Sequence, residues 1–115
     1  MDNREIFNTH KIKGLNVKIY YPNSDEYQFI INELLLPNKK LSIKGMYFDL
    51  GEYQISKFLI PLITNLDIDG KEKEKELKRS IIKGDKQVGN VVEDLKNILQ
   101  IATGIFTDNV NSGME

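Results

Sequence analysis

The segment Asn65–Glu76, NLDIDGKEKEKE, is the part of the chain whose residue types and spacing come nearest to a metal site. Oxygen-bearing side chains occupy positions one, three, five and twelve, and glycine occupies position six, which is nearly the pattern of a calcium-binding EF-hand loop. Such a loop would bind the cation through the side chains of Asn65, Asp67, Asp69 and Glu76 and the carbonyl of Lys71, with Gly70 at the sharp turn.

Several features of the same segment oppose calcium binding. Asn65 replaces the usual aspartate, Glu72 occupies the eighth position where an aliphatic residue is usual, and the sequence contains no second loop for pairing. Three lysines also raise the local positive potential. These features favour a connection between two helices, with acidic and glycine residues in a turn, over a calcium site. We expect no cofactor and no metal.

His10 is the single histidine, so a histidine-based metal triad is excluded. No glycine-flanked nucleophile sequence surrounds Ser24, Ser42, Ser56 or Ser80, and His10 is predicted to be exposed in a polar segment. The chain contains no cysteine, which excludes disulfides and thiolate zinc sites and is compatible with a reducing cytosol. The sequence therefore predicts a protein that is not an enzyme.

The charge balance argues against binding to nucleic acid or to an anionic membrane. Lysine and arginine number 16 against 17 acidic residues, so the net charge is only -1. In KEKEKELKRS the lysines alternate with glutamates that would repel phosphate, and this run predicts a solvated helix face. The longest apolar run, FLIPLI, is too short to span a membrane, and the N-terminus lacks a signal-like segment. We expect a cytoplasmic protein with a protein partner.

The first half of the chain predicts a small antiparallel sheet and one helix. Alternating apolar residues in GLNVKIYY indicate a half-buried strand. A helical stripe then runs from Tyr27 to Leu35, with Asn23 and Glu26 spaced as a capping box and Pro37 limiting the end. KKLSIKGMYFDL fits a short hairpin or a bulged strand. The aromatic residues of this half are typical of half-buried positions, although tyrosine is also enriched at interfaces.

The second half predicts about three packed helices, so the fold class is α+β and mainly helical. The first begins near Glu52, after a capping-box spacing with Asp49, and its apolar stripe reaches Leu66 with a kink or break at Pro61. A charged helix follows over 71–84. The last helix spans about 86–103 and ends at Gly104. We expect one domain over 1–106 and a flexible tail over 107–115.

From FDLGEYQISKFLIPLITNLDID onward the chain resembles the small tail assembly chaperones of bacteriophages. In these proteins an amphipathic helix and an acidic connection precede a charged helix and a longer C-terminal helix, which LKRSIIKGDKQVGNVVEDLKNILQ resembles. The likeness covers about the C-terminal two-thirds of the chain. It consists of element order, length and hydrophobic spacing, and the family has no catalytic residues to carry over.

The resemblance implies a protein that binds the apolar, helical tape measure protein and keeps it soluble while the phage tail assembles in the host cytoplasm. The expected protein-binding residues lie on two apolar stripes: Phe58, Leu62, Val91, Leu95, Ile98 and Leu99. Either stripe would form a groove, a seam between copies in a homo-oligomer, or the core of the monomer. The alternative function is a phage or mobile-element protein that inhibits a host defence or regulatory protein through its surface charges.

Overall fold

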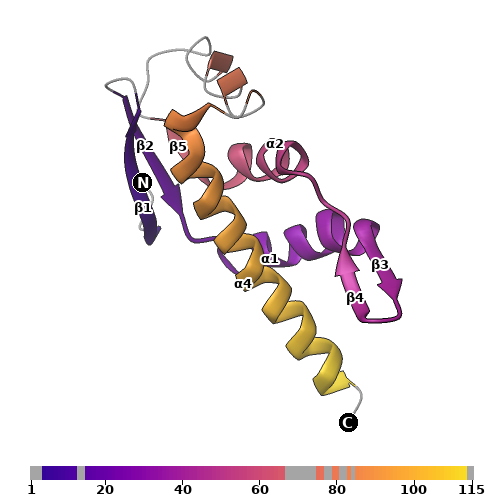
Figure 1. Cartoon of the computed structure of the whole chain (residues 1–115). Helices are drawn as coiled ribbons and strands as arrows, with labels where there is room; N and C mark the ends of the chain where they lie inside the picture. Colours follow the sequence, from indigo (N-terminus) through magenta and orange to yellow (C-terminus); the bar gives the residue numbers. More distant parts are fainter. Residues whose placement is uncertain are drawn as a thin grey trace.

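The computed structural model describes residues 4–12, 15–66, 75–76, 79–80, 83 and 85–113. Its fold is α+β, as predicted: a three-stranded antiparallel sheet, helices α1, α2 and α4, and a separate two-stranded hairpin (Figure 1). The long helix α4 begins beside the sheet and runs past α2 to the C-terminal end. The molecule measures 50 × 32 × 19 Å and has a radius of gyration of 15.3 Å. A compact domain of similar length would have about 13 Å, so this one is elongated.

The three-stranded sheet has the order β1-β2-β5. Its central strand β2 (Leu15–Tyr20) buries Val17 and Ile19 on one face, which confirms the predicted alternation. The two edge strands, β1 (Ile6–Ile12) and β5 (Thr64–Leu66), are absent from the sequence prediction. Both are antiparallel to β2, so the sheet joins segments far apart in the chain.

Helix α1 (Ser24–Ile30) begins with the predicted capping box. The Asn23 side chain accepts a hydrogen bond from the Glu26 N–H, and the Glu26 carboxylate accepts one from the Asn23 N–H, both at 2.8 Å. A π turn (Ile31–Leu35) and a 3-10 turn (Leu36–Asn38) continue the helix and include Pro37 near the end. The stripe from Ile30 to Leu35 is buried, as the spacing predicts.

Strands β3 (Lys39–Ser42) and β4 (Gly45–Phe48) form an antiparallel hairpin, which confirms the hairpin alternative. Gly45 follows the two-residue turn with φ of 123°. Residues with a Cβ are strained in that region of backbone space, so the turn requires a glycine there.

Helix α2 (Glu52–Ile63) begins where predicted, but its N-cap and its C-terminal end differ from the prediction. The N-cap is Gly51 without a side-chain hydrogen bond, so the proposed capping box of Asp49 and Glu52 is wrong. The helix ends two residues after Pro61, and Leu66 belongs to β5 instead of the helical stripe. The proline removes a backbone donor, and pairing with β2 gives the following residues a different set of hydrogen bonds.

Helix α4 (Gly89–Gly113) follows a 3-10 turn, η3 (Lys86–Val88). The prediction that Gly104 ends this helix is wrong, because the helix continues nine residues further and includes part of the predicted tail. The stripe on α4 also continues to Phe106, which packs on the hairpin and extends the helix's buried face. The domain boundary at residue 106 stays a prediction. In the predicted charged helix, residues 75–76, 79–80 and 83 are helical and the others lie outside the described residues.

The core is formed between the sheet, α1 with its π turn, α2 and α4. Among the described residues, the large apolar side chains that are less than 2% exposed come from these elements or from η3. They are Val17, Ile19, Ile30, Leu35, Leu59, Ile63, Val88, Val91, Leu95 and Ile98. Helix α4 contacts α2, β1 and the π turn, so one long helix holds the other elements together.

Candidate protein-binding surfaces

The α4 stripe that the sequence offered as a binding surface lies inside the monomer. Val91, Leu95 and Ile98 have no exposed surface, and Leu99 is half-buried beside them. On α2, Phe58 and Leu62 are also half-buried against the core. The structure therefore places both sets of residues mainly in the core, and any binding by them stays a prediction.

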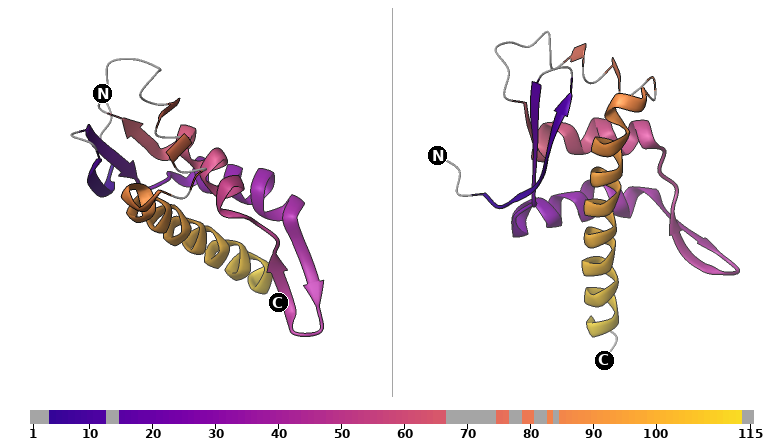
Figure 2. Two further views of the ribbon diagram at one scale, coloured as in Figure 1. Left: turned by 45° about the horizontal axis from the view of Figure 1, so that its top comes forward. Right: turned by 60° about the vertical axis from the view of Figure 1, so that its left-hand side comes forward.

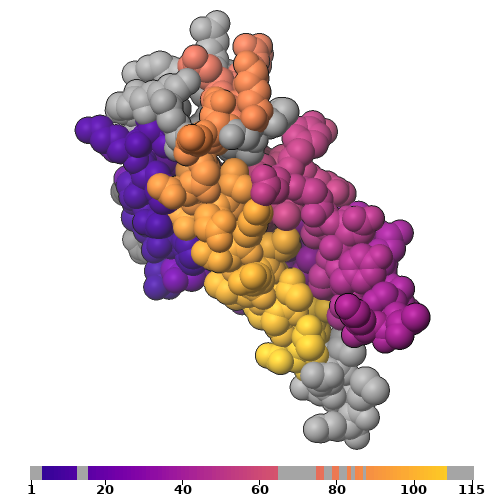
Figure 3. Space-filling view, viewed as in Figure 1, coloured from indigo at the N-terminus to yellow at the C-terminus, as the bar shows by residue number. Residues whose placement is uncertain are grey.

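The β3–β4 hairpin, residues 39–48, exposes apolar side chains to solvent, and we call it the apolar arm. Leu41 is 79% exposed and Ile43 is fully exposed, while Met46 and Tyr47 are exposed by 40% and 50%. The arm projects from the body at the end opposite the three-stranded sheet (Figure 2). In the space-filling view it forms the magenta lobe at the lower right, beside the yellow part of α4 (Figure 3).

One face of the apolar arm is partly covered by α4. Leu41 lies directly opposite Met46 in the hairpin, and Phe48 lies two residues further along the same strand. Residues directly opposite and two apart share a face of a sheet, so these three side chains form one row. Phe48 packs edge to face on Phe106 of α4, with ring centroids 6.0 Å apart, whereas Leu41 and Met46 continue the row into solvent.

The apolar arm is also positively charged. Between residues 39 and 48 the sequence has lysine at 39, 40 and 44 and contains no acidic residue. All three lysine side chains are exposed. Within the described residues, none of the three forms an ion pair, whereas other basic side chains such as Arg4 and Lys96 do.

A second exposed apolar site lies between α1 and α2. Phe29 of α1 stacks on Phe58 of α2 with ring centroids 5.4 Å apart and an interplanar angle of 20°. Phe29 remains 49% exposed, and Leu36, seven residues later, is 40% exposed. The predicted residue Phe58 therefore contributes to a surface, but as the lower layer of an aromatic stack.

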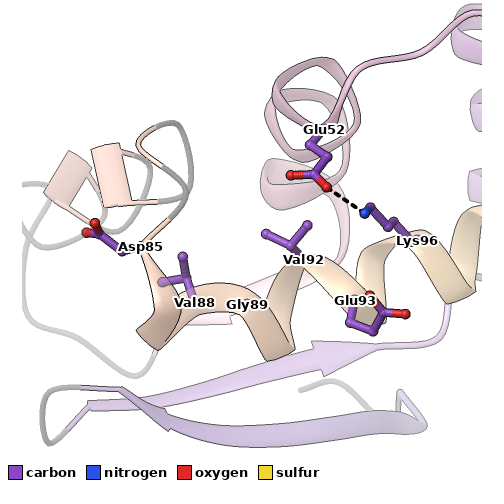
Figure 4. A pocket seen from close by; sticks show the side chains of 7 residues that line it. All are labelled: Glu52, Asp85, Val88, Gly89, Val92, Glu93 and Lys96. Atoms are coloured by element: carbon purple, nitrogen blue, oxygen red, sulfur yellow. Dashed lines mark hydrogen bonds and ion pairs between the residues drawn. The ribbon is translucent and has the colours of Figure 1, made fainter.

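A small pocket of about 140 Å³ lies where α2 faces the start of α4 (Figure 4). It is lined by Glu52, Asp85, Val88, Gly89, Val92, Glu93 and Lys96. The Lys96 ammonium donates a hydrogen bond of 2.6 Å to the Glu52 carboxylate. This hydrogen bond, reinforced by the charges of Glu52 and Glu93 and opposed by desolvation, raises the pKa of Lys96. Lys96, the one cation among the described lining residues, is thus already paired with a carboxylate, and the pocket has the character of a surface ion-pair site.

His10 is not exposed, contrary to the sequence prediction. Its Nε2 lies 2.5 Å from Oδ2 of Asp94, and the two side chains are only 15% and 11% exposed. The pair links β1 to α4 across 84 residues of sequence. A lone polar residue in a polar segment carries no local signal of such a partner, so only the tertiary structure reveals it.

In the calcium-like segment Asn65–Glu76, residues 67–74 lie outside the described residues. Its first residue, Asn65, belongs to strand β5, so a helix does not directly precede the loop as an EF-hand requires. Among the residues that the structure describes, no three acidic or histidine side chains are grouped to hold a metal ion. No described helix combines the length and the apolar character needed to cross a membrane.

Comparison with known proteins finds no matching family model, no matching curated protein and no matching solved structure. The candidate surfaces must therefore be judged from their own chemistry.

Proposed function

We propose that this protein is a non-enzymatic tail assembly chaperone of a bacteriophage, which binds the apolar tape measure protein in the host cytoplasm until the tail tube forms around it. The resemblance of the C-terminal two-thirds to that class of protein suggests the partner. The observation that carries the proposal is the exposure of the apolar arm, where Leu41 and Ile43 are almost entirely in solvent.

The exposed side chains of the arm would gain free energy if a partner buried them. Burying an aliphatic side chain of this size is favourable by about 1.5–3 kcal/mol, and the arm makes little use of that energy in the monomer. Exposed apolar surface is typical of protein-binding sites, and a second exposed site, at Phe29 and Leu36, lies on the segment that leads into the arm. A long apolar helix that would otherwise aggregate is a suitable ligand for such surfaces.

Co-expression with the tape measure protein from the same genome tests the proposal. The soluble fraction of that protein after centrifugation should rise several-fold in the presence of this chain, and the two should co-purify. An unrelated soluble protein of equal size is the control. If the tape measure protein stays insoluble, or is soluble without this chain, the chaperone function is wrong. In that case, the inhibitor function would be supported if the chain bound a defined host defence or regulatory protein stoichiometrically.

A further inference from the structure

We propose that the apolar arm binds an α-helix whose apolar stripe is flanked by carboxylates. This inference rests on the proposed function, since it specifies the chemistry of the segment that the protein would bind. It names one surface, residues 39–48, and one kind of ligand.

The contact between the arm and α4 indicates that the ligand is a helix. Phe48 at the base of the arm already packs on a helix through Phe106. Met46 and Leu41 extend the same face outward, and both remain exposed with α4 in place. The arm is thus a sheet face of which α4 covers the inner end, and a second helix would cover the outer end by the same type of packing.

The unpaired lysines indicate that the ligand is acidic. Lys39 lies opposite Phe48 on the face of the apolar row, Lys44 lies in the turn at its outer end, and Lys40 lies on the other face, opposite Tyr47. None of these lysines has a carboxylate partner among the described residues. Opposite charges beside an apolar contact steer association and fix orientation, whereas like charges suppress it. The same argument opposes pairing of two arms from two copies of this chain, because six lysines would then meet without an acidic residue between them.

The position of Lys44 opposes a lipid ligand. A hairpin that enters a membrane needs apolar side chains at its leading edge and lysines behind them at the level of the head groups. Here Lys44 lies in the turn next to Ile43, so insertion of the tip would carry an ammonium group toward the hydrocarbon. The apolar row instead runs along the arm from Leu41 to Phe48, which suits a helix lying across it.

Two synthetic peptides of about 20 residues test the charge preference directly. Both carry the same stripe of leucine and alanine at helical spacing, but one has glutamate on the flanks and the other has lysine. The full-length protein should bind the acidic peptide at least about tenfold more tightly than the basic peptide, measured by fluorescence anisotropy at low salt. Equal binding of both peptides, or binding of neither, would overturn the inference.

The double variant Lys39→Glu/Lys44→Glu changes the lysine on the face of the apolar row and the lysine at its outer end. It should reverse the preference, so that the basic peptide binds more tightly. The double variant Lys11→Glu/Lys83→Glu changes the net charge equally at exposed positions outside the arm, and it should keep the preference for the acidic peptide. A loss of preference in both double variants would mean that net charge and not the arm is responsible, which contradicts the inference. Sedimentation with anionic phospholipid vesicles should leave the protein in solution, and pelleting would favour a lipid ligand instead.

The outcomes for this inference and for the proposed function can be separated. If the tape measure protein is kept soluble but the arm shows no charge preference, the chaperone function stands and the assignment of the arm is wrong. If the arm selects the acidic peptide but the tape measure protein stays insoluble, the ligand chemistry stands and the proposed partner is wrong.

Discussion

The stripe of α4 and the apolar arm carry similar side chains in opposite environments. Val91, Leu95 and Ile98 are buried on α4 among the sheet, α1 and α2, whereas Leu41 and Ile43 on the arm are almost fully exposed. The difference arises from position: one face of α4 packs on α2, β1 and the π turn, and the arm projects beyond these elements (Figure 2). Apolar spacing shows which side chains share a face, but the surrounding elements decide whether that face is core or binding surface.

Leu95→Asp should have the largest effect, because it places a charge at a site with no exposed surface. We expect a loss of more than about 4 kcal/mol in the free energy of unfolding, a large part of the stability of a domain of this size. Loss of the cooperative thermal transition in circular dichroism would reveal it. Asn97→Asp, at an exposed position of the same helix, is the control and should melt like the wild type. A folded Leu95→Asp variant would contradict the assignment of this stripe to the core.

His10→Ala should have the next largest effect, because it leaves the buried carboxylate of Asp94 without its partner. An unsatisfied buried polar group costs about 1–3 kcal/mol, and chemical denaturation would measure this loss. The double variant with Asp94→Ala should lose less stability than the sum of the two single changes. Additive losses would show that the pair does not join β1 to α4 energetically.

Glu52→Gln tests the ion pair at the pocket, where 63% of the Glu52 side chain is exposed. Exposed ion pairs contribute about 0–1 kcal/mol, so we expect a loss at the lower end of that range. Since the folded protein holds the pKa of Lys96 above its usual value, the contribution is present below pH of about 10.4 and is lost as the pH rises beyond it. A small difference between the variant and the wild type at pH 8 that shrinks as the pH rises through the raised pKa of Lys96 would agree with this assignment, and a difference that does not depend on pH would contradict it.

Leu41→Ser/Ile43→Ser should have the smallest effect on folding, although it removes two large apolar side chains. Both are already in solvent, so the free energy of unfolding should change by less than about 0.5 kcal/mol. Thermal melting and chemical denaturation of the variant and the wild type provide the measurement. A loss comparable to that of the Leu95 substitution would mean that the arm is part of the folded core, and the contrast between the two regions would disappear.

Much of the local structure can be predicted from the sequence. The alternation around Val17 and Ile19, the capping box of Asn23 and Glu26 and the helix beginning at Glu52 are all present. Each of these depends on neighbouring residues and on backbone preferences that operate within a few positions.

The remaining features depend on contacts between distant residues. Strand β1 has no clear alternation and exists through its pairing with β2, and β5 is a three-residue strand whose Leu66 also fits the helical stripe. The His10–Asp94 pair joins residues 84 positions apart. Helix α4 continues past Gly104, where Phe106 packs on the arm. Local helix propensity gives no information about this contact.

The exposed part of the apolar arm also depends on contacts between distant residues, so the sequence predicted the binding surface only in part. The sequence suggested the two apolar stripes and a hairpin, but it could not show that α4 would cover Phe48 and leave Leu41 exposed. The length and direction of α4 relative to the hairpin determine which of these two side chains is covered. A single tertiary contact therefore separates the core part of the arm from its exposed part.

The most direct test of the central claim is co-expression of the tape measure protein with Leu41→Ser/Ile43→Ser, compared with the wild-type chain. We predict that the variant folds with wild-type stability and that the soluble tape measure protein falls to the level seen without any chaperone. If the variant keeps that protein as soluble as the wild type does, the apolar arm is not the surface that binds it.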